Sequence, residues 1–291
     1  MAPERTYYVH LEETGPDYIA AYCLDFFNKR IRVDDYSGNP SSVLRRMRAV
    51  AASRQMTKLF IKSRIRDWQR FLSEGCALEG IYKQYFDGED GYCMAEYYEL
   101  NRRNSDYWIE EDRMLAEVLK LPAKPEPPAL PEQFTMRPAS SEDAPALASL
   151  YRSVFRTYPT PMDDADYIAQ AMAGGTLFYV IERGGLTVSA ASAEKNAKYR
   201  NAEMTDCATL PAYRNLGLMR VLLQALEDDL VRSGFRCAYS LARALSFGMN
   251  AALFQMGYEY SGRLTKNCDI YDKFEDMNLW TKRLPFTLGG T

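Results

Sequence analysis

Arg214 and Gly217 lie where a predicted strand passes through a short loop into a predicted helix, in the segment ATLPAYRNLGLMRVLLQALE. The first turn of a helix leaves backbone N–H groups unpaired at its positive end, so it attracts anions. Gly217 allows a ligand to approach the backbone closely, and Arg214 adds a cation. The segment therefore indicates an anion site that suits a pyrophosphate-bearing cofactor better than a carboxylate. These residues alone leave open an ordinary strand-to-helix connection with a surface arginine.

Other kinds of catalytic site are excluded by the residues that the chain lacks. His10 is its only histidine, which rules out Ser-His-Asp, Cys-His and HExxH arrangements. The six cysteines are scattered without a CxxC pair, so we expect no metal site and no disulfide framework, but reduced thiols in a cytoplasmic protein. No signal peptide or membrane span of about 20 apolar residues is recognisable, so neither secretion nor a membrane partner is expected.

Length and composition predict two folded domains and a small-molecule partner. The 291 residues are 47% hydrophobic and 26% charged, which is typical of a globular chain with two cores. The formal net charge is −3, whereas binding to nucleic acid requires a basic surface that neutralises phosphates. We therefore expect no nucleic-acid partner, and small or cationic ligands instead.

The clearest break in the chain is LPAKPEPPALPEQ, which has five prolines within ten residues and favours an extended spacer. It divides the sequence into an N-terminal α/β domain (1–121), a linker (122–132) and a C-terminal domain (133–291). In the first domain the order is strand, then helix or turn, followed by predicted strands at 31–36, 57–62, 77–86 and 91–98 and helices at 42–55 and 66–74. The whole chain is predicted to be α/β with a mixed sheet.

The C-terminal domain has its own alternation of strands and helices. Predicted strands cover 134–138, 177–182, 186–192, 202–210, 237–243, 258–266 and 277–282. Helices are expected from 141 to 155, after the YPTPMDD loop, from 219 to the turn at Gly234, and at 246–256. The anion-binding loop thus follows a central strand of this domain.

The loop resembles the Q/R-x-x-G-x-G/A coenzyme A signature of the GNAT superfamily of N-acetyltransferases, and the element order from Phe134 onward is similar to that fold. Two positions depart from the signature. Asn215 replaces a frequent glycine, and Met219 replaces the final Gly or Ala. Asn tolerates positive φ better than most residues, and Met219 can face the core.

A closer resemblance covers most of the C-terminal domain. It is to the bacterial and archaeal β-lysine N-acetyltransferases, which make the compatible solute Nε-acetyl-β-lysine after an aminomutase has converted lysine to β-lysine. The matching segments are YPTPMDDADYI, VSAASAEKNAKYRNAEMTDCATLPAYRNLGLM, AYSLARALSFGMNAALFQMGYEYSGRL and DMNLW. The resemblance implies transfer of acetyl from acetyl-CoA to the ε-amine of β-lysine, by direct attack in a ternary complex.

The amine that accepts the acetyl group needs a base, because a lysine-type ammonium with a pKa near 10.4 is almost fully protonated at neutral pH. By the resemblance, Glu203 has the same offset from the loop as the general-base glutamate of the superfamily's histone acetyltransferases; a strand-edge ion pair is the alternative. Asp206 is the second candidate, as base or as ammonium anchor. Strand alternation puts it on the opposite face from Glu203 unless a bulge intervenes.

The resemblance also implies the residues that hold acetyl-CoA. The strand would pair with the pantetheine arm and polarise the thioester, and the loop and the following helix would hold the rest. These residues are Cys207, Ala208, Thr209, Arg214, Asn215, Leu216, Gly217, Leu218, Met219 and Asn250. We interpret Cys207 as a packing residue and not as a nucleophile, because no base is visible beside it. The superfamily's proton-donating tyrosine is replaced by Leu253, which leaves water, Ser246 or Tyr258 to protonate the thiolate.

A pocket for β-lysine needs a cation for the carboxylate, an anion for the β-ammonium group and an apolar path for the methylenes. Arg243 and Arg263 are candidates for the carboxylate. Tyr158, Asp163 and Asp164 are candidates for the ammonium end. Each of the five can instead be a solvated surface residue.

From Ile31 the N-terminal domain has the order strand, helix, strand, helix, strand, strand, which matches the C-terminal domain from Ala202 onward. It is either a degenerate half of the same fold or a chance recurrence. Its connection YSGNPSSVLRRM has no R-x-x-G, so we expect it to bind no coenzyme A, and to pack on the catalytic domain or form a homodimer contact. For the whole chain, acetylation of another small amine, a non-catalytic acyl-CoA sensor and a protein acetyltransferase remain as alternatives.

Overall fold

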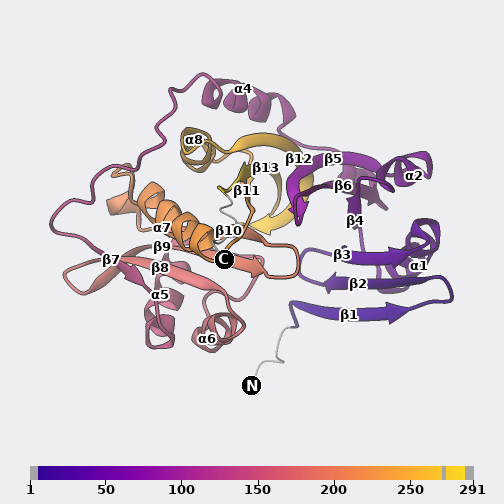
Figure 1. Ribbon diagram of the computed structural model, residues 1–291, viewed down its shortest axis with the longest axis horizontal. Coiled ribbons are helices and arrows are strands. Elements are labelled where there is room, and N and C mark those ends of the chain that lie inside the picture. The colour runs from indigo at the N-terminus through magenta and orange to yellow at the C-terminus, as the bar shows by residue number, and fades with distance from the viewer. Residues whose placement is uncertain (1–5, 271–272, 286–291) are drawn as a thin grey trace, which may run out of the picture.

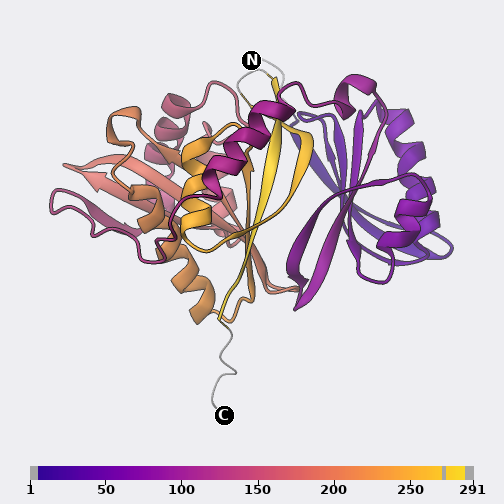
Figure 2. The same ribbon diagram turned by 90° about the horizontal axis from the view of Figure 1, so that it is seen from above.

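A computed structural model describes residues 6–270 and 273–285, and its strands form one continuous mixed sheet (Figure 1). Within the described residues the sheet has thirteen strands, in the order β1-β2-β3-β4-β6-β5-β12-β13-β11-β10-β9-β8-β7. Along this order, the strands of the N-terminal half are consecutive from one edge of the sheet, and those of the C-terminal half are consecutive from the other edge. The yellow strands of the C-terminal half lie between the two groups of elements (Figure 2).

The C-terminal half has the elements expected from its sequence. Its helices are α5 (Ala144–Val154), α6 (Ala165–Ala173), α7 (Leu218–Arg232) and α8 (Phe247–Gln255). Its strands are β7 (Thr135–Pro138), β8 (Leu177–Arg183), β9 (Leu186–Asn196), β10 (Asn201–Thr209), β11 (Cys237–Arg243), β12 (Glu259–Ile270) and β13 (Lys273–Arg283). The apolar face of α7 is buried against β8, β9 and β10, which fixes the helix on one face of the sheet.

The N-terminal half begins with a hairpin that the sequence did not predict. Its strands are β1 (Tyr8–Thr14), β2 (Tyr18–Asp25), β3 (Arg30–Gly38), β4 (Lys58–Arg64), β5 (Ala77–Phe86) and β6 (Glu89–Tyr97). Its helices are α1 (Pro40–Arg54), α2 (Trp68–Ser73), α3 (Leu100–Arg103) and α4 (Trp108–Val118). The element expected before residue 31 as a helix or turn is therefore a strand, β2, whose alternating buried residues belong to the core under α1.

The two halves have the same strand order. Strands β1 to β6 are arranged β1-β2-β3-β4-β6-β5, and β8 to β13 are arranged β8-β9-β10-β11-β13-β12. In each half one parallel pair, β3 with β4 and β10 with β11, is flanked by antiparallel pairs. Helices α1 and α7 follow the equivalent strands β3 and β10. This shared topology supports the hypothesis that the N-terminal half is a degenerate copy of the C-terminal fold.

The halves pack through the sheet faces that α1 and α7 leave uncovered. A separate apolar cluster between them contains residues of both, and the rings of Tyr82 and Tyr239 meet edge to face at 5.1 Å. Strands β5 and β12 join at Gly80 and Gly262. The turn between β9 and β10 reaches the other half, where the Tyr199 hydroxyl donates to Asp35 at 2.6 Å.

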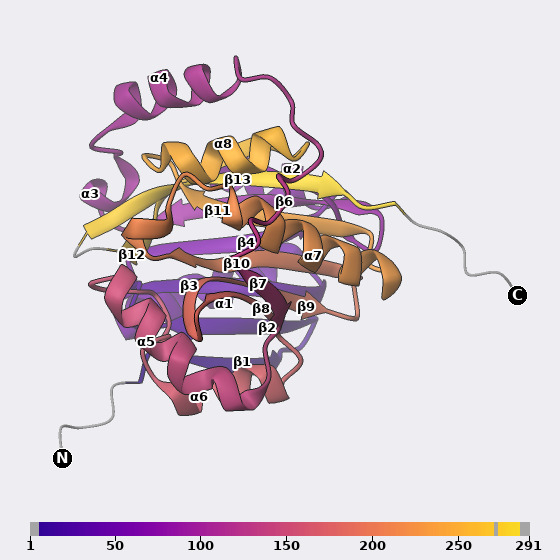
Figure 3. The ribbon, with the colours of Figure 1, turned by 90° about the vertical axis from the view of Figure 1, so that its left-hand side faces the viewer.

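Helix α4 belongs spatially with the C-terminal half although it precedes the predicted boundary at residue 121. It lies along α8 (Figure 3). Leu115 and Val118 are buried in the C-terminal core. Neither α3 nor α4 is predicted by the sequence pattern, and the division into domains at 121 and 133 stays a prediction.

All six cysteines are free thiols. Among the helices of residues 6–270 and 273–285, none is long and apolar enough to cross a membrane.

The junction between the halves can be tested at Gly262. A Cβ atom there would lie 2.2 Å from the Glu79 carbonyl oxygen, and its φ of +143° disfavours any side chain. We expect Gly262→Ala to lower the free energy of unfolding by roughly 3 kcal/mol or more, because β5 and β12 must separate. Gly75→Ala is the control, since Gly75 also has positive φ (+100°) but has open space around it; we expect about 1–2 kcal/mol there. If urea unfolding showed the same decrease in the free energy of unfolding for both variants, the close approach of β5 and β12 would make no particular contribution to stability.

Candidate functional site

Strands β10 and β11 separate part-way along their length. They pair in parallel only between Asn201–Glu203 and Cys237–Tyr239, whereas β11 pairs with β13 over its full length. On the other edge of β10 the register with β9 shifts between Thr205 and Ala208. This is the bulge that the sequence analysis required for Glu203 and Asp206 to share a face, and it turns β10 away from β11.

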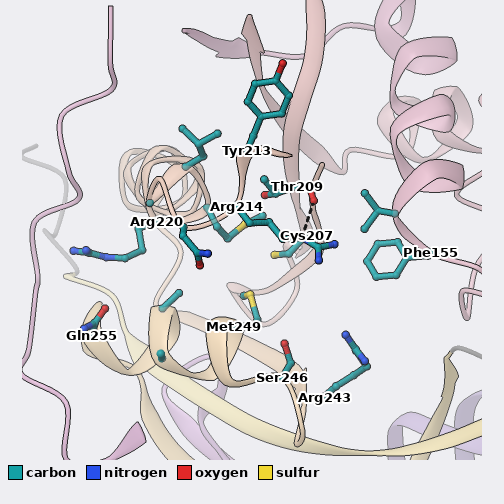
Figure 4. A pocket seen from close by; sticks show the side chains of 18 residues that line it. Phe155, Cys207, Thr209, Tyr213, Arg214, Arg220, Arg243, Ser246, Met249 and Gln255 are labelled. Atoms are coloured by element: carbon teal, nitrogen blue, oxygen red, sulfur yellow. Dashed lines mark hydrogen bonds between the residues drawn. The ribbon is translucent and has the colours of Figure 1, made fainter. Parts of the chain in front are cut away.

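The loop after β10 forms a cavity at the start of α7. Asn215 and Gly217 both have positive φ, +63° and +73°, so Asn215 adopts the conformation for which the superfamily often uses glycine. The cavity has a volume of about 460 Å³, and Arg214 and Arg243 line it (Figure 4). Met219 is also among the lining residues. Cys207, Thr209, Gly217 and Leu218 also line it. Leu216 is exposed beside this cavity without lining it, and Ala208 is buried in the strand.

The open edge of β10 presents backbone groups to this cavity. The Leu210 N–H donates to the Val188 carbonyl oxygen at 2.9 Å, which directs residue 210 towards β9. Successive residues of an antiparallel strand turn their backbone groups to opposite edges, so those of Thr209 face the split. The Arg214 guanidinium donates to the Thr209 carbonyl at 3.2 Å from that side.

Two smaller cavities continue inward from the first. One of about 120 Å³ lies between β10 and β11 and is lined by Cys207, Ser246, Asp206 and Tyr158 among others. The other, of about 130 Å³, has Tyr158 and Asp206 in its wall and extends to residues of the N-terminal half, so we call it the inner chamber. Shared lining residues therefore connect the loop cavity with a chamber that both halves enclose.

Asp206 occupies the bulge with a φ of +49° and is almost fully buried. Its carboxylate accepts hydrogen bonds from the Ser192 hydroxyl at 2.6 Å and the Tyr158 hydroxyl at 3.1 Å. Burial raises the pKa of Asp206 to about 6, against the opposing effect of these two hydrogen bonds. Asp206 is thus ionised near neutral pH and can still be protonated, as a general base must be.

Glu203 and Glu194 add two more carboxylates to the inner chamber. They are directly opposite each other in the β9–β10 register. Like charges in such a pair repel. Desolvation by the surrounding protein raises the pKa of Glu194, and the negative charges of Glu203 and Asp206 raise it further. Sequence reasoning missed Glu194, although alternation along a hairpin across from Glu203 could have suggested it.

Comparisons with known proteins agree with this geometry. Residues 144–258 match the Acetyltransferase (GNAT) family. The N-acetyltransferase YodP of Bacillus subtilis is 39% identical over 89% of this chain and 94% of its own length. The chain belongs to the GNAT family of acetyltransferases. It is an acetyl-CoA-dependent N-acetyltransferase.

Two further relatives are each named beta-lysine N(6)-acetyltransferase. The Methanosarcina mazei protein is 35% identical over 86% of this chain and 100% of its own length, and the Methanococcus maripaludis protein is 33% identical over 88% and 93%. Among solved structures, an acetyltransferase from Salmonella typhimurium with its cofactor acetyl-CoA is 17% identical over 54% of this chain and 98% of its own, with a TM-score of 0.46.

The GNAT loop cavity fits the diphosphate end of coenzyme A. The first turn of α7 supplies unpaired backbone N–H groups, and Arg214 and Arg243 supply positive charge at the cavity wall. The Arg220 side chain, by contrast, donates to the carbonyl oxygens of Lys124 and Glu126, so it is held by the linker. Bound coenzyme A would present the thioester to the split between β10 and β11.

The environments of Cys207 and Asn250 suit roles in packing and in positioning a helix. Burial raises the pKa of the Cys207 thiol, which opposes a nucleophilic role. The Asn250 amide is fully engaged: it donates to the carbonyls of Arg243 and Ser246, and accepts from Asn278 and Trp280. Asn250 therefore fixes the start of α8, and lines none of the three cavities. This differs from the cofactor contact expected of it.

The candidates for the proton donor differ in whether they line the cavities. Leu253 is fully buried in the core. The Tyr258 ring is buried and lines none of the three cavities. Ser246 lines the first two, so of the two hydroxyl candidates it is the one that borders the proposed path of the thioester.

Only two of the five expected substrate residues, Tyr158 and Arg243, come together, in the wall of the second cavity. Tyr158 also lines the inner chamber, whereas Arg243 also lines the loop cavity and forms an ion pair with Glu275 at 3.8 Å. Asp164 caps α6 through the Asp166 N–H, and the exposed Asp163 accepts from Arg152 through its backbone carbonyl. Arg263 donates to Asp112 at 2.8 Å and to Asn278 at 2.9 Å. Asp163, Asp164 and Arg263 line none of these three cavities, so the structure does not place them to bind a substrate there.

Gly217 offers a direct test of the loop. A Cβ atom there would lie 2.5 Å from Pro128 Cγ, so Gly217→Ala must displace the loop or the linker. We expect coenzyme A affinity to fall about tenfold or more, which corresponds to about 1.4 kcal/mol. Gly234→Ala is the control, because Gly234 follows the other end of α7 with a similar φ of +76° and open surroundings. Isothermal titration that gave both variants the same dissociation constant would contradict the assignment of this loop.

Proposed function

We propose that this enzyme transfers the acetyl group of acetyl-CoA to the ε-amine of β-lysine, by direct attack in a ternary complex. The observation that carries the proposal is the connected path from the loop cavity to the acid-lined inner chamber, with Asp206 in the walls of both inner cavities. The names of the two archaeal relatives support the choice of substrate. A role for the product as a compatible solute, in the cytoplasm, is part of the proposal; the six free thiols are compatible with a reducing compartment.

Along this path the acetyl donor and the amine acceptor would enter from opposite ends and come together at β10. The thioester would enter from the loop cavity, and the amine from the inner chamber. Glu194, Glu203 and Asp206 attract a cationic amine to the chamber. Leu241, Ile270 and Met277 provide an apolar wall for methylene groups. The site therefore suits a flexible aliphatic amine better than an aromatic one.

In the proposed reaction the neutral ε-amine forms a bond to the thioester carbonyl carbon, and the carbon–sulfur bond breaks. The proton leaves the amine for Asp206, directly or through a water molecule. A backbone N–H on the open edge of β10, at Thr209, would stabilise the carbonyl oxygen; such a donor is worth about 3 kcal/mol. Water or the Ser246 hydroxyl would protonate the coenzyme A thiolate, which with a pKa near 8.5 is already a tolerable leaving group.

A substrate panel tests the proposed function. Purified enzyme and acetyl-CoA are mixed separately with β-lysine, α-lysine, ornithine and spermidine, and the products are identified by mass spectrometry. We expect a strong preference for β-lysine, with acetyl on the ε-nitrogen, because two relatives of this chain are named for that activity. Preference for spermidine would redirect the assignment to polyamines. Coenzyme A binding without acetylation of any amine would favour a sensor.

The assignment of the base predicts a pH dependence. Asp206 accepts a proton only when ionised, so kcat/KM should fall about tenfold per pH unit below its pKa of about 6 and level off above it, until other groups titrate. Asp206→Asn should lose about 10²–10⁴-fold in kcat together with this acidic limb. Glu203→Gln is the matched variant from the same chamber and should keep the limb. If Glu203→Gln removes the limb and Asp206→Asn keeps it, Glu203 is the base.

A further inference from the structure

The N-terminal half lines the inner chamber with charged side chains. Arg32 on β3 and Lys62 on β4 both lie in the chamber wall. They are on the sheet face opposite to the one that α1 covers, because alternate residues such as Ile31 and Ile61 form the core under that helix. The chamber is thus shared by two halves of different character.

Arg32 and Lys62 share a single carboxylate. Arg32 Nε and Lys62 Nζ each approach Asp34 at 2.9 Å, and Lys62 also donates to the Tyr85 hydroxyl at 2.9 Å. Two cations against one anion leave this group with an excess positive charge. The Arg32 Nη groups make no hydrogen bond to any residue in the described part of the chain, and its side chain is 30% exposed. A partly buried guanidinium in this state is suited to bind a further anion.

The third cation of the chamber, Arg30, already has hydrogen-bond partners within the protein. It donates to Asp25 at 2.9 Å and to the Asn267 carbonyl at 2.8 Å, and it is almost fully buried. The opposite wall, from the C-terminal half, carries the three carboxylates Glu194, Glu203 and Asp206. One wall of the chamber is therefore positive and the other negative. A ligand with a carboxylate at one end and amines at the other matches both walls.

We propose that Arg32, with Lys62 behind it, binds the carboxylate of the amine substrate, so that the N-terminal half selects amino acids over polyamines and other amines without a carboxylate. This inference rests on the proposed acetyltransfer at Asp206. The guanidinium offers its two Nη groups to the carboxylate, and Asp34 fixes its orientation through Nε. The N-terminal half then has a role in recognition, beyond the packing or dimer contact expected from the sequence.

The test compares β-lysine with its primary amide, 3,6-diaminohexanamide, which keeps the shape and both amines but loses the negative charge. For the wild type we expect kcat/KM to be at least about tenfold higher for β-lysine, the range of a charge-assisted hydrogen bond. Arg32→Gln should raise KM for β-lysine about 10- to 100-fold, leave KM for the amide nearly unchanged and bring the two substrates together. The coenzyme A dissociation constant reports on correct folding.

Matched variants separate recognition from structure. Arg46→Gln is the control, because Arg46 pairs with Glu13 on the exposed side of the same half. Arg32→Lys should restore part of the discrimination between β-lysine and its amide, because it keeps the charge. If Arg32→Gln does not fold, Lys62→Met replaces it in the test and should reduce the same discrimination. A wild type that uses both substrates equally, or an Arg32→Gln that impairs both equally, would overturn the carboxylate site and leave the proposed function standing. A wild type that acetylates neither compound would instead refute the proposed function.

Discussion

Asp206 has a positive φ at the point where β10 leaves β11, and the geometry of the site depends on this irregularity. A non-glycine residue in this conformation is unfavourable and persists only when its surroundings hold it. Three side chains do so: the Tyr151 hydroxyl donates to the Asp206 carbonyl at 2.7 Å, while Tyr158 and Ser192 bind the carboxylate. The bulge opens the split for the thioester, exposes the edge of β10 and turns a carboxylate into the inner chamber. In the proposed reaction, this one local distortion brings donor, acceptor and base together.

The N-terminal half has a comparable irregularity with the opposite chemistry. In the β2–β3 register Ala21 is opposite Asp35 and Tyr22 opposite Val33, which leaves Asp34 as the extra residue. Arg32 and Lys62 neutralise Asp34 and lower its pKa, whereas the Asp206 carboxylate accepts from the Ser192 and Tyr158 hydroxyls and burial raises its pKa. The connection to α1 also differs, since Asn39 caps that helix through the Ser41 N–H and Pro40 occupies its first position. These differences explain how one topology can supply the proposed base in one half and a cationic wall in the other.

The sequence predicts what depends on local pattern and misses what depends on pairing across the sheet. Helix α7 and the loop before it follow from apolar spacing and from Gly217, and the need for a bulge at Asp206 follows from strand alternation. Glu194 and Arg32 escaped notice because only the packing of distant strands brings them to the chamber. The charge of Arg263 suggests a substrate carboxylate as its partner, but Arg263 instead donates to Asp112 of α4, a helix that the sequence pattern does not predict.

The proline-rich segment, predicted as a spacer between two domains, also bonds to two helices of the C-terminal half. The Lys124 N–H donates to the Gln255 carbonyl at the end of α8, and the carbonyls of Lys124 and Glu126 accept from Arg220 in the first turn of α7. Proline favours extended backbone and lacks an N–H, so carbonyl groups in such a segment remain available to outside donors. Helix α4 anchors the other end of the segment through Leu115 and Val118 in the C-terminal core. Because the segment holds both helices that line the coenzyme A cavity, it is part of the catalytic half, and the two halves share more than the chamber between them.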